Sequence, residues 1–295
     1  MHSNKLKDTR RNAIIMAAGT SSRFVPLSAE IPKGLLTVRG EVLIERQIRQ
    51  LNEAGINDIT VVVGYMADSF AYLSDKFGVK IVFNEDFNKY NNTSSLICVA
   101  DRIDNTFICS SDNYFPENVF LHKSQESYYS ALYSSGITNE YCIAIDDDDN
   151  ITGVTIGGND SWYMVGHAYF SSEFSKKFVQ LLKREYENES VRMGYWEDLY
   201  IKFIADLPKM KIHRYADSAI NEFDTLDELR MFDQSYVSDT RSRIIKQIAK
   251  QLNCNEAELS EFRKENGSGA HVCFYFNKGK KPYRYNGFDE SITAL

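Results

Sequence analysis

The chain has 295 residues, of which 43% are hydrophobic and 25% charged, and its net charge is −7. This size allows one large globular domain, with or without a small appendage. The acidic balance argues against nucleic acid or anionic membranes as partners, since both require a basic surface. No apolar run approaches the roughly 18 residues of a membrane span, and the basic start of the chain lacks the apolar stretch of a secretory signal. We therefore expect a soluble, cytoplasmic protein with small-molecule substrates and no membrane insertion.

A buried strand followed by a loop of small residues is the first element along the chain. The apolar residues 13–16 predict the strand, and the loop that follows holds Ala17, Ala18, Gly19, Thr20, Ser21 and Ser22. Small side chains let backbone N–H groups approach phosphate oxygens closely. Arg23 and Lys33 supply countercharge, because arginine forks onto two oxygens while lysine acts as a point charge. The loop has neither the P-loop nor the dinucleotide-binding spacing. A nucleoside triphosphate site of another class is the functional interpretation, and a simple turn is the alternative.

Strands and helices alternate as far as residue 109. Helical spacing of apolar residues predicts helices over 43–54, 69–77 and 94–99, and continuous apolar runs predict strands over 59–63, 80–83 and 106–109. This alternation is typical of an α/β protein with a mostly parallel sheet. Asp112 follows the last of these strands, at the sheet edge where ligands bind in open α/β sheets. We therefore expect Asp112 and the loop after Met16 to face the same crevice.

Two further carboxylates are candidate metal ligands. Glu222 and Asp224 lie two residues apart on an extended segment, so their side chains point the same way. Magnesium takes one or two carboxylates together with phosphate oxygens and waters. We expect Asp112, Asp224 and Glu222 to bind Mg²⁺ beside the triphosphate. A turn role for Asp112 and a helix N-cap role for Asp224 are the alternatives, and a capping aspartate still has a free oxygen.

Aromatic residues are dense in the second half of the chain, next to acidic residues. Such a set can bind a quaternary ammonium group through cation–π contacts and a nearby carboxylate. The alternative is that Trp162 and Trp196 fill the core. The residues in question are Trp162, Tyr163, Tyr169, Tyr195, Trp196 and Tyr200, with Glu197 and Asp198.

The opening loop resembles that of the nucleotide-sugar pyrophosphorylase-like nucleotidyltransferases. Their motif runs A-A-G-x-G-x-R-x-x-P-L-T and is followed by P-K; the matching residues are Gly19, Arg23, Pro26, Leu27, Pro32 and Lys33. Ser21 replaces the usual second glycine and Ser28 the threonine, so Ser21 must adopt either an ordinary φ or a strained one. The resemblance implies a Rossmann-like nucleotidyltransferase fold, with a three-layer, mixed and mostly parallel sheet. It also implies that the Asp224 segment joins Asp112 on the metal.

Three later segments resemble the bacterial CTP:phosphocholine cytidylyltransferases of this superfamily: VVVGYMADSF, FNEDFNKYNNTSSL and GYWEDLY. This resemblance extends from about residue 12 to 232. It implies that Gly64, Tyr65, Asn92 and Ser94 contribute to nucleotide binding. It also implies that Tyr195, Trp196 and Glu197, together with Trp162, bind phosphocholine.

The last part of the chain, residues 238–295, lies outside that resemblance. Helices are expected over 244–252 and 257–262, and a hairpin over 271–287 that turns at 277–280. We expect a nucleotidyltransferase domain over 1–237 and a small α+β extension over 238–295. The extension weakly resembles the start of a choline kinase, but no kinase catalytic loop follows. A packing or dimerisation element is the expected role, and a homodimer is one option that the sequence leaves open.

The resemblance implies CMP transfer from CTP to phosphocholine, giving CDP-choline and pyrophosphate by Mg²⁺-dependent in-line attack. A phosphomonoester is already anionic at neutral pH and needs no general base. Catalysis is therefore assigned to positioning and charge neutralisation by Arg23, Lys33, Asp112 and Asp224. Two alternatives stay open. One is transfer to another phosphorylated or phosphonylated amine or a sugar 1-phosphate, and the other is a catalytically silent nucleotide-binding regulatory subunit.

Overall fold

The computed structural model describes residues 10–265 and 272–295. The described chain divides into two compact units. The first contains residues 10–19 and 45–221, and the second contains Thr20–Ile44 and Glu222–Leu295. The predicted boundary between residues 237 and 238 lies inside the second unit. Within the described ranges, no helix has the length and apolar content needed to cross a bilayer.

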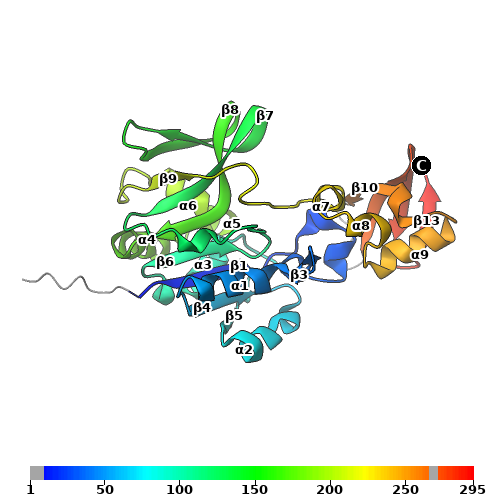
Figure 1. Ribbon diagram of the computed structural model, residues 1–295, viewed down its shortest axis with the longest axis horizontal. Helices are drawn as coiled ribbons and strands as arrows, with labels where there is room; N and C mark the ends of the chain where they lie inside the picture. The colour runs from blue at the N-terminus through cyan, green and yellow to red at the C-terminus, as the bar shows by residue number, and fades with distance from the viewer. Residues whose placement is uncertain (1–9, 266–271) are drawn as a thin grey trace, which may run out of the picture. The chain divides into compact units, whose positions relative to one another are not determined.

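The first unit is built on one mixed sheet (Figure 1). Its central strand β1 is parallel to β4 and β6, and β8 runs antiparallel to β6 and β7. The register pairs Ala17 with Val63 and Met16 with Ser110, so β1, β4 and β6 end at the same edge. The predicted mixed, mostly parallel sheet is confirmed. In sheet order the strands are β5 (Lys80–Phe83), β4 (Asp58–Val63), β1 (Asn12–Ala17), β6 (Thr106–Ser110), β8 (Ile151–Phe170), β7 (Tyr128–Ile145) and β9 (Lys211–Arg214).

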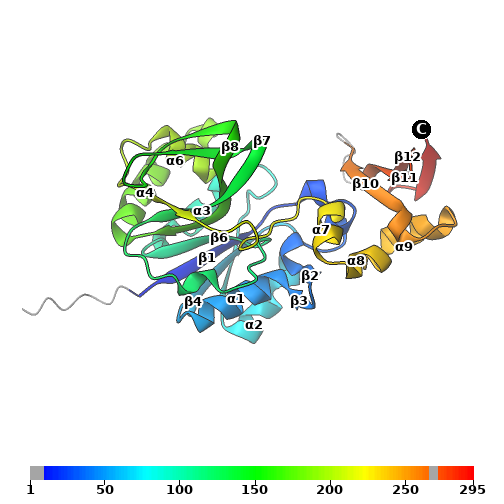
Figure 2. The same ribbon diagram turned by 45° about the horizontal axis from the view of Figure 1, so that its top comes forward.

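Helices cover both faces of this sheet, which gives the predicted three layers. Ile14 and Ile108 of the sheet share a core with α3, α4 and α6, whereas Figures 1 and 2 show α1 and α2 on the other side. The three helices predicted before residue 109 are present, although residues 67–70 form a separate 3-10 turn ahead of α2. The helices are α1 (Leu43–Glu53), α2 (Tyr72–Phe77), α3 (Thr93–Cys98), α4 (Ser172–Glu185), α5 (Glu189–Met193) and α6 (Trp196–Lys202).

Strands β7 and β8 form a long ribbon that bends back on itself. Cys142 of β7 pairs with both Thr155 and Tyr163 of β8, which requires the ribbon to fold over. Gly158 lies at the close approach, where an added Cβ would come within 2.8 Å of the Cys142 Sγ.

The second unit starts with short elements and ends in a sheet. Its early elements are the 3-10 turns η1 (Ser22–Phe24), η2 (Leu27–Ala29) and η3 (Lys33–Leu35) and the hairpin β2 (Thr37–Val38) with β3 (Glu41–Val42). The later ones are α7 (Leu226–Phe232), α8 (Ser235–Ser238), α9 (Arg243–Gln251), η7 (Glu256–Glu258) and a four-stranded antiparallel sheet of β10 (Leu259–Lys264), β11 (Cys273–Lys278), β12 (Lys281–Asn286) and β13 (Ser291–Ala294).

The prediction of a helix over 257–262 is wrong, because this segment becomes η7 and strand β10. Leu259 and Phe262 are both buried with helix-like spacing, but the pairing with β11 shifts register between Ser260 and Arg263. Such an irregularity brings residues three apart to one face of a strand and so imitates the helical period. Helix α9 and the hairpin of β11 and β12 are confirmed, while residue 271 of the predicted hairpin lies outside the described residues.

Candidate active site

The loop after β1 lies against the segment after β4 in the first unit. The backbone N–H of Tyr65 donates to the carbonyl oxygen of Ala18 at 3.1 Å. A Cβ added to Gly64 would lie 2.4 Å from the Cβ of Phe87 and 2.9 Å from the Ala18 oxygen. Only glycine fits there without a shift. The predicted nucleotide-binding residues Ala17, Ala18, Gly64 and Tyr65 are thus brought together.

Asn84, which the sequence analysis missed, organises the start of α3. It follows β5 directly and its side-chain amide donates to the Ser94 Oγ at 2.8 Å and the Ser95 Oγ at 3.2 Å. The Ser94 hydroxyl donates in turn to the carbonyl oxygen of Asn91. The hydroxyl group of Ser94 is therefore hydrogen-bonded within the protein. In the sequence, the position of Asn84 directly after the predicted strand 80–83 was the signal that could have found it.

Asp112 lies just beyond the carboxyl end of β6, as predicted. Its Oδ1 accepts from the Ser110 Oγ at 2.7 Å, and the N–H of Ser111 donates to the carbonyl oxygen of Met16 at 3.1 Å. The next side chain, Asn113, is buried and donates to the carbonyl oxygen of Val165. These bonds fix a half-buried carboxylate at the edge where β1 and β6 end.

In the second unit, Arg23, Lys33, Glu222 and Asp224 form one cluster. Arg23 contacts an Asp224 oxygen at 2.7 Å, and the Lys33 Nζ lies 3.6 Å from Asp224 and 3.7 Å from Glu222. The Lys33 side chain is 5% exposed and that of Arg23 is 75% exposed. Two cations and two carboxylates predicted from distant parts of the sequence are thus in contact.

The local backbone conformation before Arg23 and after Asp224 determines where these two side chains lie. Ser21 adopts the left-handed conformation (φ 46°, ψ 47°), which is the strained option left open by the missing glycine, and its carbonyl oxygen accepts from the Phe24 N–H. Thr20 beside it is exposed. The N-cap of α7 is Thr225, whose side chain accepts from Glu228, so the N-cap alternative for Asp224 is wrong. The Asp224 carboxylate faces the two cations.

Of the aromatic candidates, Trp196 belongs to the core. The residue is 1% exposed, and its ring stacks on Tyr129 at 5.5 Å and meets Phe170 edge-on. This burial matches the core-filling alternative. Trp162 lies in the β7 and β8 ribbon against Tyr133, with the Arg214 guanidinium 5.5 Å from its ring centre, whereas Tyr195 is 46% exposed. Contacts of Trp162 and Tyr195 with an acceptor stay a prediction.

Glu197 of the first unit is an acid with a strongly raised pKa. Its carboxylate accepts from the Tyr129 hydroxyl at 2.9 Å and from the Asn92 amide at 3.3 Å. Burial raises the pKa of Glu197 to about 7; the hydrogen bonds oppose that rise and the neighbouring Asp198 adds to it. The sequence analysis missed Tyr129 and Tyr141, whose hydroxyl donates to Asp198. Their partners lie more than fifty residues away in the chain.

Glu222 and Asp224 are candidate ligands of the predicted magnesium ion. Among the described residues, no group of three or more His, Cys, Asp and Glu side chains is arranged to hold a metal ion. Magnesium does not need such a group, because it uses one or two carboxylates plus substrate phosphates and waters. Glu222 and Asp224 provide paired hard oxygen donors of that kind, so the residues present fit the ion.

Comparisons with known proteins identify the family of this chain. Residues 13–134 match the family model of the MobA-like NTP transferase domain. The chain is 35% identical over 237 residues to the 2-aminoethylphosphonate cytidylyltransferase of Lancefieldella rimae, covering 79% of this chain and 96% of that one. It is 31% identical to the choline-phosphate cytidylyltransferase of Streptococcus pneumoniae, covering 75% and 96%.

Among solved structures, the CTP:phosphocholine cytidylyltransferase of Streptococcus pneumoniae superposes with a TM-score of 0.73 and 31% identity, covering 77% of this chain and 99% of that one. A putative glucose-1-phosphate thymidylyltransferase from Bacillus anthracis shares the fold, with a TM-score of 0.61 and 17% identity, covering 76% and 94%. The predicted family and fold are confirmed. The chain is a cytidylyltransferase and belongs to the bacterial choline-phosphate cytidylyltransferase family, within the NTP transferase superfamily.

Proposed function

We propose that the protein transfers CMP from CTP to phosphocholine and releases CDP-choline and pyrophosphate. A phosphate oxygen of the acceptor attacks the α-phosphorus, and the bond to the oxygen of the departing pyrophosphate breaks. No general base is assigned, because a phosphomonoester with a second pKa near 6 is already ionised at neutral pH. The reaction then depends on positioning and on charge neutralisation.

The cluster of Arg23, Lys33, Glu222 and Asp224 is the observation that carries the transfer chemistry. In the proposal, Arg23 and Lys33 leave their carboxylate partners in part to contact the triphosphate. Lys33 is the stronger candidate, because its side chain is 5% exposed and its ammonium group lies near two acids, where charges interact more strongly than in water. Asp112, Asp224 and Glu222 are the residues that would hold Mg²⁺, which when bound neutralises phosphate charge.

The nucleotide is assigned to the backbone around Ala17, Gly19 and Gly64, and to the neighbouring residues of the same loops. A Cβ on Gly19 would meet no described atom within 4 Å, so this position leaves room for a ligand. For Asn92 and Ser94, the proposed contacts with the nucleotide are made by the backbone, since both side chains are hydrogen-bonded within the protein. Thr20, Ser21 and Ser22 continue the loop toward Arg23.

Glu197 supports a cationic acceptor. Its partly buried carboxylate accepts from the Tyr129 hydroxyl, and Tyr195, two residues earlier in the chain, is exposed. An acid beside aromatic residues fits the fixed positive charge of choline. Transfer to 2-aminoethylphosphonate is the second candidate, because a relative of that name is 35% identical and a primary ammonium can donate hydrogen bonds to Glu197 and Asp198.

A pyrophosphate-release assay on the full-length protein tests the proposal. CTP, UTP, dTTP and ATP are each combined with phosphocholine, phosphoethanolamine, 2-aminoethylphosphonate and glucose 1-phosphate. The highest kcat/KM is expected for CTP with phosphocholine. A higher value with 2-aminoethylphosphonate would establish the second candidate, and nucleotide binding without pyrophosphate release from any pair would favour the regulatory alternative.

A further inference from the structure

The Thr20–Ile44 segment, which carries Arg23 and Lys33, has little regular structure of its own. It contains three 3-10 turns of three residues each and a hairpin of two-residue strands. Elements this short do not persist alone. The positions of Arg23 and Lys33 therefore depend on what the segment is bonded to within the second unit.

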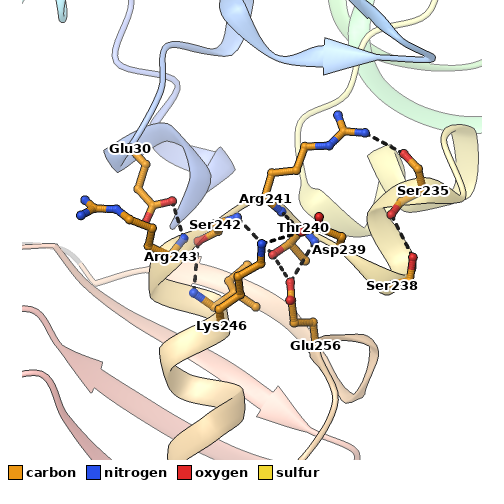
Figure 3. Close-up of polar contacts among 11 residues, drawn as sticks. Glu30, Ser235, Ser238, Asp239, Thr240, Arg241, Ser242, Arg243, Lys246 and Glu256 are labelled. Carbon is orange, nitrogen blue, oxygen red and sulfur yellow. Dashed lines mark hydrogen bonds and ion pairs between the residues drawn. The ribbon is translucent and has the colours of Figure 1, made fainter.

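Glu30 bonds the segment to the start of α9. Its two carboxylate oxygens accept from the backbone N–H groups of Arg243 at 3.0 Å and Ile244 at 2.9 Å. The Ser242 hydroxyl accepts from Ile245, so the first three N–H groups of α9 all have partners. Figure 3 shows Glu30 reaching the first turn of this helix. A negative charge there is also favoured by the helix dipole. Glu30 is thus held by two directed bonds, and the segment with it.

A second link joins the Thr37 carbonyl oxygen to one residue of α8 and to one residue after this helix. It accepts from the Tyr236 hydroxyl at 2.9 Å and from the Arg241 guanidinium. Arg241 also donates to the Ser235 Oγ at 2.9 Å, which fixes its direction (Figure 3). Turn η1, which contains Arg23, lies against strand β10.

The Asp224 side of the cluster has its own link. The buried guanidinium of Arg230 in α7 donates to the carbonyl oxygens of Glu256 at 2.8 Å and Leu259 at 2.6 Å. The neighbouring Asp227 accepts from the Glu261 N–H at 2.8 Å. Both the cations and the carboxylates of the cluster are therefore tied to residues 238–295.

We propose that residues 238–295 position the Thr20–Ile44 segment for nucleotidyl transfer, with Glu30 as the positioning residue. The proposal rests on the roles assigned to Arg23 and Lys33 above. The matches cover 79% and 75% of this chain but 96% of each of the two cytidylyltransferase relatives, so this chain carries residues outside what it shares with them. In the proposal, residues 238–295 act on the transfer machinery through the bonds that Glu30, Thr37, Arg230 and Asp227 make.

Full-length Glu30→Ala and Glu30→Gln variants test this, with Glu187→Ala as the control. Glu187 is an exposed residue of the first unit whose removal changes the charge equally. Hydrogen exchange of peptides from residues 20–44 is measured by mass spectrometry, together with kcat and the KM values of both substrates. Glu30→Ala should speed exchange in 20–44 by about tenfold, since a lost cap of this kind shifts local equilibria on that scale. It should also raise the KM for CTP and lower kcat, with the KM for the acceptor unchanged.

Glu30→Gln should fall between the wild type and Glu30→Ala, because glutamine keeps one acceptor oxygen. If Glu30→Ala fails to fold, the glutamine variant carries the test. Unchanged exchange over 20–44, or kinetic effects equal to those of Glu187→Ala, would overturn the positioning role. The exchange result does not depend on turnover, so a failure of the proposed reaction and a failure of this inference are distinguishable.

Discussion

The side chain of Asn92 bonds to α6 at two points, donating to the Glu197 carboxylate at 3.3 Å and accepting from the Trp196 N–H at 2.8 Å. The resemblance at the sequence level placed Asn92 with the nucleotide and Glu197 with the acceptor. One asparagine thus connects the two predicted binding segments directly. A substitution of Asn92 should therefore affect acceptor binding as well as nucleotide binding, and so should a substitution of Glu197.

The raised pKa of Glu197 predicts how stability depends on pH. In the unfolded chain this carboxyl has a pKa near 4.5, and in the folded protein it is raised to about 7. The folded state therefore binds the proton more tightly, and the contribution of Glu197 to stability falls as pH rises from about 4.5 to about 7. Glu197→Gln should gain stability relative to the wild type over this window, by on the order of 1–3 kcal/mol at pH 8. Thermal unfolding from pH 5 to pH 8 measures it, and a difference that is constant with pH would contradict the assignment.

Choline binding should follow the same ionisation. Choline carries a fixed charge, so its affinity changes with pH only through the protein. If Glu197 faces the acceptor in its ionised form, the Kd for choline should fall by about tenfold between pH 6 and pH 8, as expected for one coupled group with a pKa near 7. Titration calorimetry measures it. In Glu197→Gln the dependence should be nearly flat, and equal slopes in both proteins would remove Glu197 from the acceptor site.

Lys33→Ala should damage turnover far more than nucleotide binding. The buried ammonium group lies between Glu222 and Asp224, so its loss removes a preorganised charge and leaves two acids side by side. Loss of such a group typically costs about 10²–10³ in kcat. Pyrophosphate release gives kcat, and a direct binding assay gives the Kd for CTP. An unchanged kcat would refute the catalytic role of Lys33.

Arg23→Ala removes the exposed cation of the same cluster and should separate activity from stability. The Arg23 side chain is 75% exposed, and ion pairs at exposed positions contribute about 0–1 kcal/mol. Its removal should therefore lower activity with little change in unfolding temperature. A large loss of stability in Arg23→Ala would mean that the pair with Asp224 is structural.

Patterns local in sequence predicted most of the fold. The strand and loop at 13–22, the alternation up to residue 109 and helix α9 follow from apolar periodicity. Gly55 and Gly78 directly follow the predicted helices 43–54 and 69–77 and mark where these helices end. The bent ribbon of β7 and β8 could not be predicted in this way, because its contacts join Cys142 to two separate parts of β8.

The candidate site was likewise predicted only where its residues belong to a local motif. Arg23, Lys33 and Asp224 carry a motif, whereas Tyr129 and Asn84 act through partners that only the folded chain brings near.

Ser21→Gly should stabilise the protein. Ser21 adopts φ 46°, and a left-handed non-glycine residue costs about 1–2 kcal/mol in strain. Glycine relieves this strain but loses part of the gain through its greater freedom in the unfolded chain, about 0.4–1 kcal/mol. A net increase of up to about 1 kcal/mol in the free energy of unfolding is expected. Ser22→Gly, which changes a residue inside η1, is the matched control and should destabilise the protein.

Gly64→Ala should destabilise the first unit and weaken nucleotide binding. The added Cβ would lie 2.4 Å from the Phe87 Cβ and 2.9 Å from the Ala18 carbonyl oxygen, and neither is the flexible end of a side chain. The backbone after β1 or β4 must shift, which costs about 1–3 kcal/mol for an overpacked site. Gly153→Ala is the control, because its Cβ would meet no described atom within 4 Å. Chemical denaturation and CTP binding measure both variants. A Gly64→Ala protein as stable as Gly153→Ala, with unchanged CTP affinity, would show that the contact between the two loops does not shape the nucleotide site.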